Sequence, residues 1–224
     1  MRTAAILPIK RFSAAKQRLG ASVEDPLHAQ LVRAMVGDVL RALAGTPGIE
    51  LTIAVTNEPV AIATARAFDA LIVADRDEAG QSAAVELGIT RALEEGFERV
   101  LCVPGDCPAL EADELAELLE QGVPGPPGVV VVPDRHGTGT NGLLLQPPDA
   151  IAASFGPDSC ARHLALAREA GVQARVEPGV ASLLLDVDTG ADLSALRDRL
   201  AGEHSGAPGT RVLLDGDTAA SAAA

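Results

Sequence analysis

Residues 100–108 read VLCVPGDCP, and the order of residue types in this segment decides the fold. Four apolar residues come first, a Pro-Gly-Asp turn follows, and a helix is expected over residues 111–121. An apolar run without alternating polar residues is typical of a strand buried on both faces, as in parallel sheets. The carboxylate of Asp106 therefore follows a buried strand directly.

The same alternation recurs along the chain. Apolar runs predict further strands at residues 4–8, 51–55, 70–73, 129–132, 143–145 and 183–187. Helices are predicted over residues 26–44, 58–68, 82–95, 159–170 and 191–200. Strands that alternate with helices form a mainly parallel sheet covered on both faces. The predicted fold is therefore a single-domain, three-layer α/β/α sandwich of the Rossmann-like class.

A chain of 224 residues is large enough for one domain with a substantial core. This domain is expected to span residues 1–201. Beyond it, residues 202–224 are rich in small residues and end in an alanine-rich run. Such a composition predicts a disordered, low-complexity tail.

The composition excludes several classes of partner. A net charge of −13 and the absence of Trp and Tyr disfavour nucleic acid, which requires a basic face or aromatic stacking. No apolar run approaches the length needed to span a membrane, and residues 1–12 do not resemble a signal peptide. Three cysteines without a zinc-binding spacing indicate reduced thiols. We therefore expect a cytoplasmic protein that binds neither nucleic acid nor a membrane.

Three aspartates near the ends of apolar runs are the candidate metal ligands. Asp106 follows residues 100–103, and Asp186 and Asp188 lie at the end of residues 183–187. Ligands of open parallel sheets bind beyond the carboxyl ends of the strands, and Mg²⁺ prefers oxygen donors such as carboxylates. If the late run is a strand, Asp186 and Asp188 share a face and repel each other unless a cation lies between them. The alternative is that these residues cap helices or shape turns.

A basic cluster follows the first predicted strand. It consists of Lys10, Arg11, Lys16 and Arg18. In an acidic chain, cations at the carboxyl edge of the sheet are suited to neutralise the phosphates of a nucleoside triphosphate. The alternative is a solvated surface, which is the common position for charged residues.

Two later segments are suited to bind an anion. Residues 137–142, GTGTNG, formally match the dinucleotide-binding fingerprint, but a strand rather than a helix is expected to follow them. We interpret them as a loop whose amides and hydroxyls contact an anionic ligand, with a merely flexible loop as the alternative. Residues 155–159, FGPDS, lead into a helix whose N-terminus suits a phosphate or carboxylate. There the alternative is ordinary capping by Asp158 or Ser159.

Taken together, several of these motifs resemble one enzyme family. They are residues 7–10 (LPIK), 15–19 (AKQRL), 80–84 (GQSAA), 105–108 (GDCP) and the loop 134–141. This combination, which covers nearly the whole predicted domain, resembles the guanylyltransferases of coenzyme F-420 (deazaflavin) biosynthesis. The resemblance implies a nucleotidyltransferase-like α/β fold and transfer of GMP from GTP to phosphoenolpyruvate or 2-phospho-L-lactate. A composition rich in Ala, Gly and Arg favours phosphoenolpyruvate, the acceptor of actinobacterial members.

The resemblance also implies roles for individual residues. Mg²⁺, or alternatively Mn²⁺, is expected to bind Asp106, Asp186 and Asp188. Catalysis is assigned to Asp106, Lys16 and Arg18, and nucleotide binding to Lys10, Lys16, Arg18, Gln81 and Ser82, the last two as contacts to the base. The phosphorylated acid is expected at Thr140, Gly156 and Ser159. The products are pyrophosphate and enolpyruvoyl-2-diphospho-5'-guanosine, and a downstream transferase of the pathway is the expected partner.

The chain departs from related nucleotidyltransferases in one respect. Residues 8–19 contain no glycine, so triphosphate binding must depend more on side chains. Within the same class, the alternative is a cytidylyltransferase or another nucleotidyltransferase, and 3-phosphoglycerate remains a further possible acceptor. From a different class, the alternative is a noncatalytic or NAD-binding α/β domain that uses residues 137–142.

Overall fold

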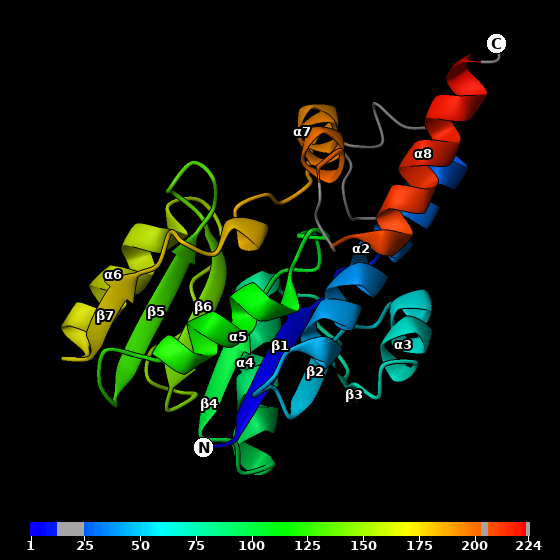
Figure 1. Cartoon of the computed structure of the whole chain (residues 1–224). Helices are drawn as coiled ribbons and strands as arrows, with labels where there is room; N and C mark the ends of the chain where they lie inside the picture. The colour runs from blue at the N-terminus through cyan, green and yellow to red at the C-terminus, as the bar shows by residue number, and fades with distance from the viewer. Residues whose placement is uncertain (13–24, 203–205, 223–224) are drawn as a thin grey trace.

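The computed structural model describes residues 1–12, 25–202 and 206–222, which form a sheet flanked by helices (Figure 1). The seven-stranded sheet has the order β3-β2-β1-β4-β6-β5-β7. The strands are β1 (Thr3–Pro8), β2 (Leu51–Val55), β3 (Leu71–Val73), β4 (Arg99–Cys102), β5 (Gly128–Pro133), β6 (Thr140–Gln146) and β7 (Gln173–Val176). The helices are α2 (Asp25–Gly45), α3 (Pro59–Arg66), α4 (Gln81–Glu94), α5 (Ala112–Gln121), α6 (Ser159–Glu169), the 3-10 turn η1 (Ala181–Leu183), α7 (Gly190–Leu200) and α8 (Pro208–Ala222).

The sheet is mainly parallel, as its buried apolar strands predict. β1 pairs in parallel with β2 and β4, β2 with β3, and β5 with β7. Among the described strands, only β6 runs antiparallel to its neighbours, β4 and β5. Because residues 134–139 are too few to form a crossover helix, β5 and β6 pair antiparallel. The carboxyl ends of β1 and β4 lie side by side at one edge of the sheet.

Helices cover both faces of the sheet, which confirms the predicted three-layer sandwich. On one face, α2, α3 and α5 pack in a cluster that includes Leu7, Leu40 and Leu115. On the other face, α4 and α6 pack in a cluster that includes Ile6 and Ile89. Ile6 and Leu7 enter different clusters because successive side chains of a strand point to opposite faces.

The late apolar run at residues 183–187 differs from the prediction, because it forms no strand. Leu183 is buried in the cluster beneath α2 and α5, and Val187 is buried with α7 and α8. An apolar run reports burial and does not distinguish a strand from another segment enclosed by helices. The inference that Asp186 and Asp188 share one strand face is therefore wrong.

Strand β7 has no counterpart among the predicted strands. It forms the edge of the sheet beside β5, and its sequence QARV is largely exposed. A strand at an exposed edge needs no continuous apolar run, so its sequence carries no strong signal.

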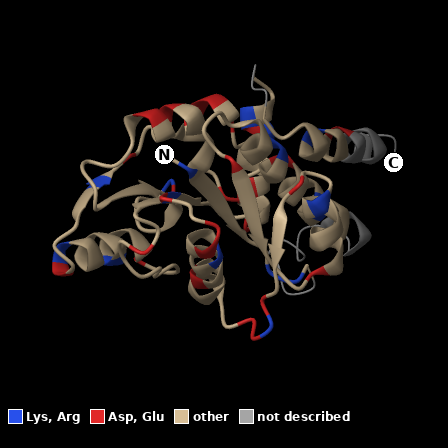
Figure 2. Cartoon of the chain, turned by 90° about the horizontal axis from the view of Figure 1, so that it is seen from below, with Lys and Arg blue, Asp and Glu red and all other residues tan. Residues whose placement is uncertain are grey.

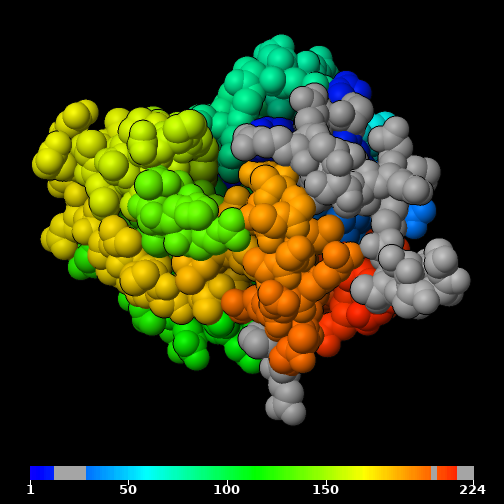
Figure 3. Space-filling model, turned by 90° about the horizontal axis from the view of Figure 1, so that it is seen from above, coloured from blue at the N-terminus to red at the C-terminus, as the bar shows by residue number. Residues whose placement is uncertain are grey.

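The C-terminal segment differs from the prediction of a disordered tail. Residues 208–222 form α8, which packs on α2. The Asp38 carboxylate of α2 accepts hydrogen bonds from the amides of Gly209 and Thr210 at 2.9 and 2.8 Å, and Leu214 is buried. This carboxylate satisfies two amides at the start of α8, which a helix cannot satisfy by itself. Figure 3 shows α8 (red) beside the α7 segment (orange).

Among the described residues, acidic and basic side chains occur on many of the same elements, although α5 carries acidic ones alone. Figure 2 shows Asp and Glu interspersed with Lys and Arg along the ribbon. In that view, the Lys and Arg of the described residues are spread over several elements. None of the helices in the described part of the chain is long and apolar enough to cross a membrane.

Candidate active site

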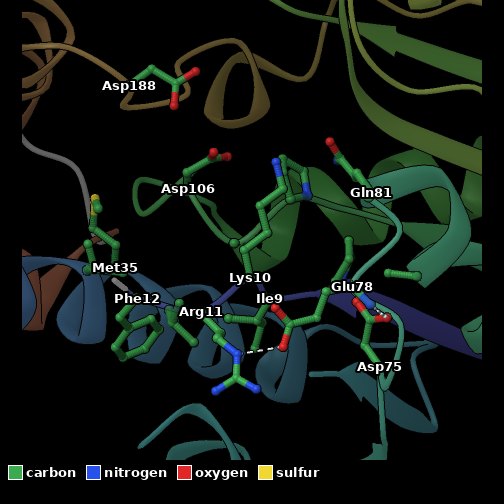
Figure 4. A pocket seen from close by; sticks show the side chains of 17 residues that line it. Ile9, Lys10, Arg11, Phe12, Met35, Asp75, Glu78, Gln81, Asp106 and Asp188 are labelled. Carbon is green, nitrogen blue, oxygen red and sulfur yellow. Dashed lines mark hydrogen bonds and ion pairs between the residues drawn. The ribbon is translucent and has the colours of Figure 1, made fainter. Parts of the chain in front are cut away.

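A cavity of about 260 Å³ lies at the carboxyl ends of β1 and β4 (Figure 4). Lys10 lines it from the segment after β1, Asp106 from the turn after β4, and Gln81 from the start of α4. The Ile9 amide donates to a carbonyl of β2 at 3.0 Å, so the segment that carries Lys10 continues the pairing of β1. Gly80, directly before α4, has a φ of +105°, which favours glycine. The edge of the sheet therefore gathers these predicted side chains around one space.

A backbone hydrogen bond joins Asp106 to the segment after η1. The Val187 amide donates to the Asp106 carbonyl at 2.9 Å, and Asp188 also lines the cavity. The Asp186 carboxylate accepts a hydrogen bond from the Asn141 amide group at 3.3 Å. Burial and the negative charges of Asp106 and Asp188 raise the pKa of Asp186, against the opposing effect of Asn141. The three aspartates therefore lie close enough for their charges to interact.

These oxygen donors suit a hard divalent cation. Within residues 1–12, 25–202 and 206–222, no group of three His, Cys, Asp or Glu side chains is arranged to hold a metal ion. Mg²⁺, however, is usually held by only one or two carboxylates together with substrate phosphates and water. The negative charges of Asp106 and Asp188 repel the Asp186 carboxylate, and a cation bound beside them would relieve this repulsion. The donor set therefore fits Mg²⁺, and also Mn²⁺.

Thr189 caps helix α7, whereas the side chain of Asp188 does not take part in this cap. Thr189 is the N-cap of α7 and forms a capping box with Asp192. The Asp192 carboxylate also accepts the Asp188 amide at 3.0 Å and forms an ion pair with Arg135. Burial acts to raise the pKa of Asp192. The pKa is nevertheless lowered overall, by hydrogen bonds from Thr189 and Asp188 and by the positive charge of Arg135. The backbone of Asp188 is thus held by Asp192, while its side chain lines the cavity.

The predicted basic cluster is only partly described by the structure. Lys10 and Arg11 line the cavity, and the Arg11 guanidinium pairs with the Glu78 carboxylate at 2.5 Å. Lys16 and Arg18 lie outside the described residues. Their assignment to the triphosphate and to catalysis therefore stays a prediction.

Thr140, Gly156 and Ser159 do not line this cavity, but the structure brings their segments together. The Cys160 amide of α6 donates to a carbonyl of the loop before β6 at 3.0 Å. Thr140 and Ser159 are buried, and Gly156 has a φ of +110°. Asp158 is the N-cap residue of α6 but makes no side-chain capping hydrogen bond, so capping by Asp158 is not observed. The N-terminus of α6 and the start of β6 thus form one unit.

Ser82 connects this unit to the cavity. Its hydroxyl accepts a hydrogen bond from the Phe155 amide at 2.8 Å. One turn further along α4, the Glu86 carboxylate accepts the Ala153 amide at 2.5 Å. Helix α4 begins at the cavity with Gln81, so these contacts tie the cavity wall to the loop that precedes α6.

Residues 137–142 do not form a dinucleotide-binding turn. They connect β5 to the antiparallel β6 and include the first residues of β6, whereas that fingerprint requires a strand followed by a helix. The Asp134 carboxylate organises the loop by accepting the amides of His136 and Thr138 at 3.1 and 3.0 Å. The NAD-binding alternative therefore loses its structural basis.

Several candidate residues are absent from the sequence-based predictions. Phe12, Asp75 and Glu78 line the cavity. Asp75 and Glu78 follow β3, so the rule that ligands bind beyond strand ends is a signal that would have identified them. His163, buried in α6 beside Thr140, has no local signal because its partners belong to other segments.

Comparison with known sequences agrees with this geometry. Residues 3–205 match the family described as guanylyl transferase CofC like. A phosphoenolpyruvate guanylyltransferase of Conexibacter woesei is 46% identical, over 96% of this chain and 96% of its own length. A protein of the same name from Rubrobacter xylanophilus is 40% identical, over 86% of this chain and 92% of its own length.

Solved structures share the fold at low sequence identity. A Desulfovibrio desulfuricans protein assigned as a nucleotide-diphospho-sugar transferase has a TM-score of 0.71 and 19% identity, covering 98% of this chain and 96% of its own. A nucleotidyl transferase from Methanothermobacter has a TM-score of 0.63 and 20% identity, covering 89% and 98%. The chain thus has the fold of the nucleotidyltransferase-like α/β proteins. Within that class, the chain belongs to the guanylyl transferase CofC-like family.

Proposed function

We propose that this chain transfers GMP from GTP to phosphoenolpyruvate, forming enolpyruvoyl-2-diphospho-5'-guanosine and pyrophosphate. The observation that carries the proposal is the convergence of Lys10, Asp106 and Asp188 on one cavity at the carboxyl edge of the sheet. The relatives from C. woesei and R. xylanophilus, both named phosphoenolpyruvate guanylyltransferase, support this choice of reaction. We assign the reaction to coenzyme F-420 biosynthesis in the cytoplasm, before a transferase that consumes the product.

In the proposed reaction, a phosphate oxygen of phosphoenolpyruvate attacks the α-phosphorus of GTP. The new phosphorus–oxygen bond forms as the bond to the β-phosphate breaks, and pyrophosphate leaves with the electron pair. Both substrates are anions, so the protein must cancel their repulsion and hold them in line. Lys10 supplies a positive charge at the cavity, and Lys16 and Arg18 are proposed to bind the triphosphate.

Asp106, Asp186 and Asp188 are the residues that we propose hold Mg²⁺. The bound ion would withdraw charge from the phosphate oxygens and help to align the substrates. The hydrogen bond between Val187 and Asp106 holds the two ligand segments together, and Asp192 holds the backbone of Asp188. The carboxylates are therefore positioned by backbone contacts within the chain itself.

The proposed reaction needs no covalent intermediate with the protein. Cys102 and Cys107, on either side of the turn after β4, are both buried. Burial raises the pKa of the Cys102 thiol, and the Cys107 thiol donates to the Leu183 carbonyl at 3.7 Å. Neither thiol is thus activated as a nucleophile, which favours direct transfer between the two substrates.

The acid is proposed to bind at Thr140, Gly156 and Ser159, beside the N-terminus of α6, where the positive end of the helix dipole suits an anion. Because the Ser159 amide donates to the Gly156 carbonyl at 3.1 Å and the Cys160 amide to the Thr138 carbonyl at 3.0 Å, we propose that the acid is held by the Thr140 hydroxyl and the positive end of the helix dipole.

For the base, the proposed contacts are Gln81, which lines the cavity, and Ser82, which follows it in α4 and lies outside the cavity lining; the cavity adds Asp75. A carboxylate can accept both the N1–H and the N2–H of guanine, whereas adenine presents an acceptor at N1. Asp75 therefore supports GTP over ATP, and Asp75→Asn is expected to reduce that preference when pyrophosphate release is compared between the two nucleotides.

The test of the proposed function is pyrophosphate release with Mg²⁺. Each nucleoside triphosphate is paired with phosphoenolpyruvate, 2-phospho-L-lactate and 3-phosphoglycerate, with the downstream transferase present to consume an unstable product. We expect release from GTP with phosphoenolpyruvate, and its loss when EDTA is added. No release from GTP with any of these acids would refute the proposal, and release from CTP alone would replace it with a cytidylyltransferase.

A further inference from the structure

His163 is a fully buried histidine of α6 with a hydrogen-bonding partner at each ring nitrogen. Its Nε2 accepts a hydrogen bond from the Ser154 amide at 2.9 Å. Its Nδ1 lies 3.0 Å from the hydroxyl oxygen of Thr140. The ring therefore bridges the loop before α6 and the first residue of β6, which are the two segments of the proposed acid site.

These two contacts determine which ring nitrogen carries the proton. A backbone amide can only donate, so Nε2 must be the unprotonated nitrogen. The neutral imidazole then carries its proton on Nδ1 and donates it to the Thr140 oxygen. Burial and the positive charge of Arg162 lower the pKa of His163 to about 4, so the ring is neutral near pH 7.

The direction of this hydrogen bond decides what Thr140 offers to a ligand. Because its oxygen accepts the proton of His163, its own hydroxyl proton points away from the ring and can be donated elsewhere. A phosphate or carboxylate consists of acceptors and is the preferred partner for such a donor. With the opposite tautomer, the hydroxyl would donate to Nδ1 and present only lone pairs, which repel an anion.

We propose that His163 is a positioning residue of the acid site, whose Nδ1 proton holds the Thr140 hydroxyl as a hydrogen-bond donor to the phosphorylated acid. This inference rests on the proposed function, which assigns Thr140 to the acid. His163 itself does not touch the acid and acts through Thr140.

The surroundings of His163 hold the ring in this orientation. The Phe155 ring meets it edge to face, with centroids 5.1 Å apart and planes at 72°. Arg162 donates to the carbonyls of Ser154 and Phe155 at 2.9 and 3.0 Å, which fixes the loop whose amide binds Nε2. Ser82 accepts the Phe155 amide, so the same loop is tied to α4 and to the cavity. Protein contacts alone therefore set the tautomer before any ligand binds.

Two substitutions of His163 test its contacts with Thr140 and Ser154 one at a time. His163→Asn places an amide near the position of Nδ1, which keeps a donor for Thr140 and removes the acceptor for Ser154. His163→Gln places its amide near the position of Nε2, which keeps the acceptor for Ser154 and removes the donor to Thr140. We expect His163→Gln to raise KM for phosphoenolpyruvate about tenfold, and His163→Asn to raise it no more than about threefold. KM for GTP should stay unchanged in both.

Thr140→Val supplies a double-mutant test. It removes the hydroxyl and should raise KM for phosphoenolpyruvate at least as much as His163→Gln does. Combining the two substitutions should cause no increase beyond that of Thr140→Val, because His163 acts only through this hydroxyl. Additive effects, equal effects of the Asn and Gln substitutions, or a parallel rise in KM for GTP would overturn the proposal in favour of a structural role.

The tautomer can also be measured in the unaltered protein, so the proposal does not depend on a variant that folds. Nitrogen NMR of protein labelled with ¹⁵N in histidine should show His163 protonated on Nδ1, the minor tautomer of free histidine. A ring protonated on Nε2 would overturn the proposal. If the unaltered protein releases no pyrophosphate from GTP and phosphoenolpyruvate, the proposed function fails instead, an outcome recognised before any variant is compared.

Discussion

Replacement of Asp106 by Asn tests the site directly, because Asn keeps the size of the side chain and removes its charge. The hydrogen bond from the Val187 amide goes to the backbone carbonyl of Asp106, so the junction of the two segments is retained. Loss of one group that stabilises charge in the transition state typically costs about 2.7–4 kcal/mol, or roughly 10²–10³ in rate. We expect kcat/KM for GMP transfer to fall by that factor in Asp106→Asn.

Stability should change in the opposite direction. The charge of Asp106 is one cause of the raised pKa of Asp186, so the two carboxylates repel each other in the metal-free protein. Because solvent screens part of this repulsion, its removal in Asp106→Asn should raise the free energy of unfolding by about 0.2–0.5 kcal/mol at neutral pH. The substitution should therefore slow the reaction strongly without weakening the fold.

The assay combines pyrophosphate release from GTP and phosphoenolpyruvate with urea unfolding in EDTA. Asp149→Asn makes the same chemical change at an exposed aspartate away from the cavity and should alter neither measurement. Unaltered turnover in Asp106→Asn would refute its catalytic role. A loss of turnover that is matched by a loss of stability would show that Asp106 supports the fold instead.

Three further predictions concern the fold around the site. The pKa of His163 is lowered from 6.5 to about 4, so its contribution to stability is present above pH 6.5 and is lost as the pH falls towards 4. Urea unfolding should show a loss of roughly 3 kcal/mol over this range, and a smaller one in His163→Gln; equal losses would contradict the assignment. Gly88→Ala should destabilise the protein by about 1–2 kcal/mol, because the Cβ of the new alanine would lie 2.4 Å from Cγ2 of the buried Ile6. Thermal unfolding measures this loss, and an unchanged Tm would contradict the packing of α4 on β1. Asp38→Ala removes the acceptor of two amides of α8, so hydrogen exchange at Gly209 should accelerate about tenfold or more while exchange in β1 stays slow.

Most of the fold is predictable from local periodicity. The apolar runs of β1, β2, β4 and β5 lie in the centre or the parallel part of the sheet, where burial on both faces demands apolar side chains. The prediction fails where a segment is buried without pairing in the sheet, or pairs in the sheet without being buried. Residues 183–187 are buried by helices without pairing, and β7 pairs at an exposed edge with a polar sequence. Helix α8 is missed because its N-terminal acceptor, Asp38, belongs to α2.

Likewise, only part of the candidate site could be predicted from the sequence. Lys10 and Asp106 were accessible to prediction because both directly follow strands whose carboxyl ends share one edge. The approach of Asp188 to Asp106 was expected for the wrong reason, since no strand aligns Asp186 with Asp188. A backbone hydrogen bond from Val187 to Asp106 joins the segments instead.

By itself, the sequence determined the layered α/β fold and the strand end at which chemistry would occur, because both depend on the spacing of apolar residues along a local segment. Only the tertiary structure decided which side chains meet there. The pairing of Thr140 with His163 depends on how α6 packs beside β6, and the tautomer of that histidine depends on an amide in a third segment. Contacts of this kind are set by packing between distant parts of the chain, which no local pattern encodes.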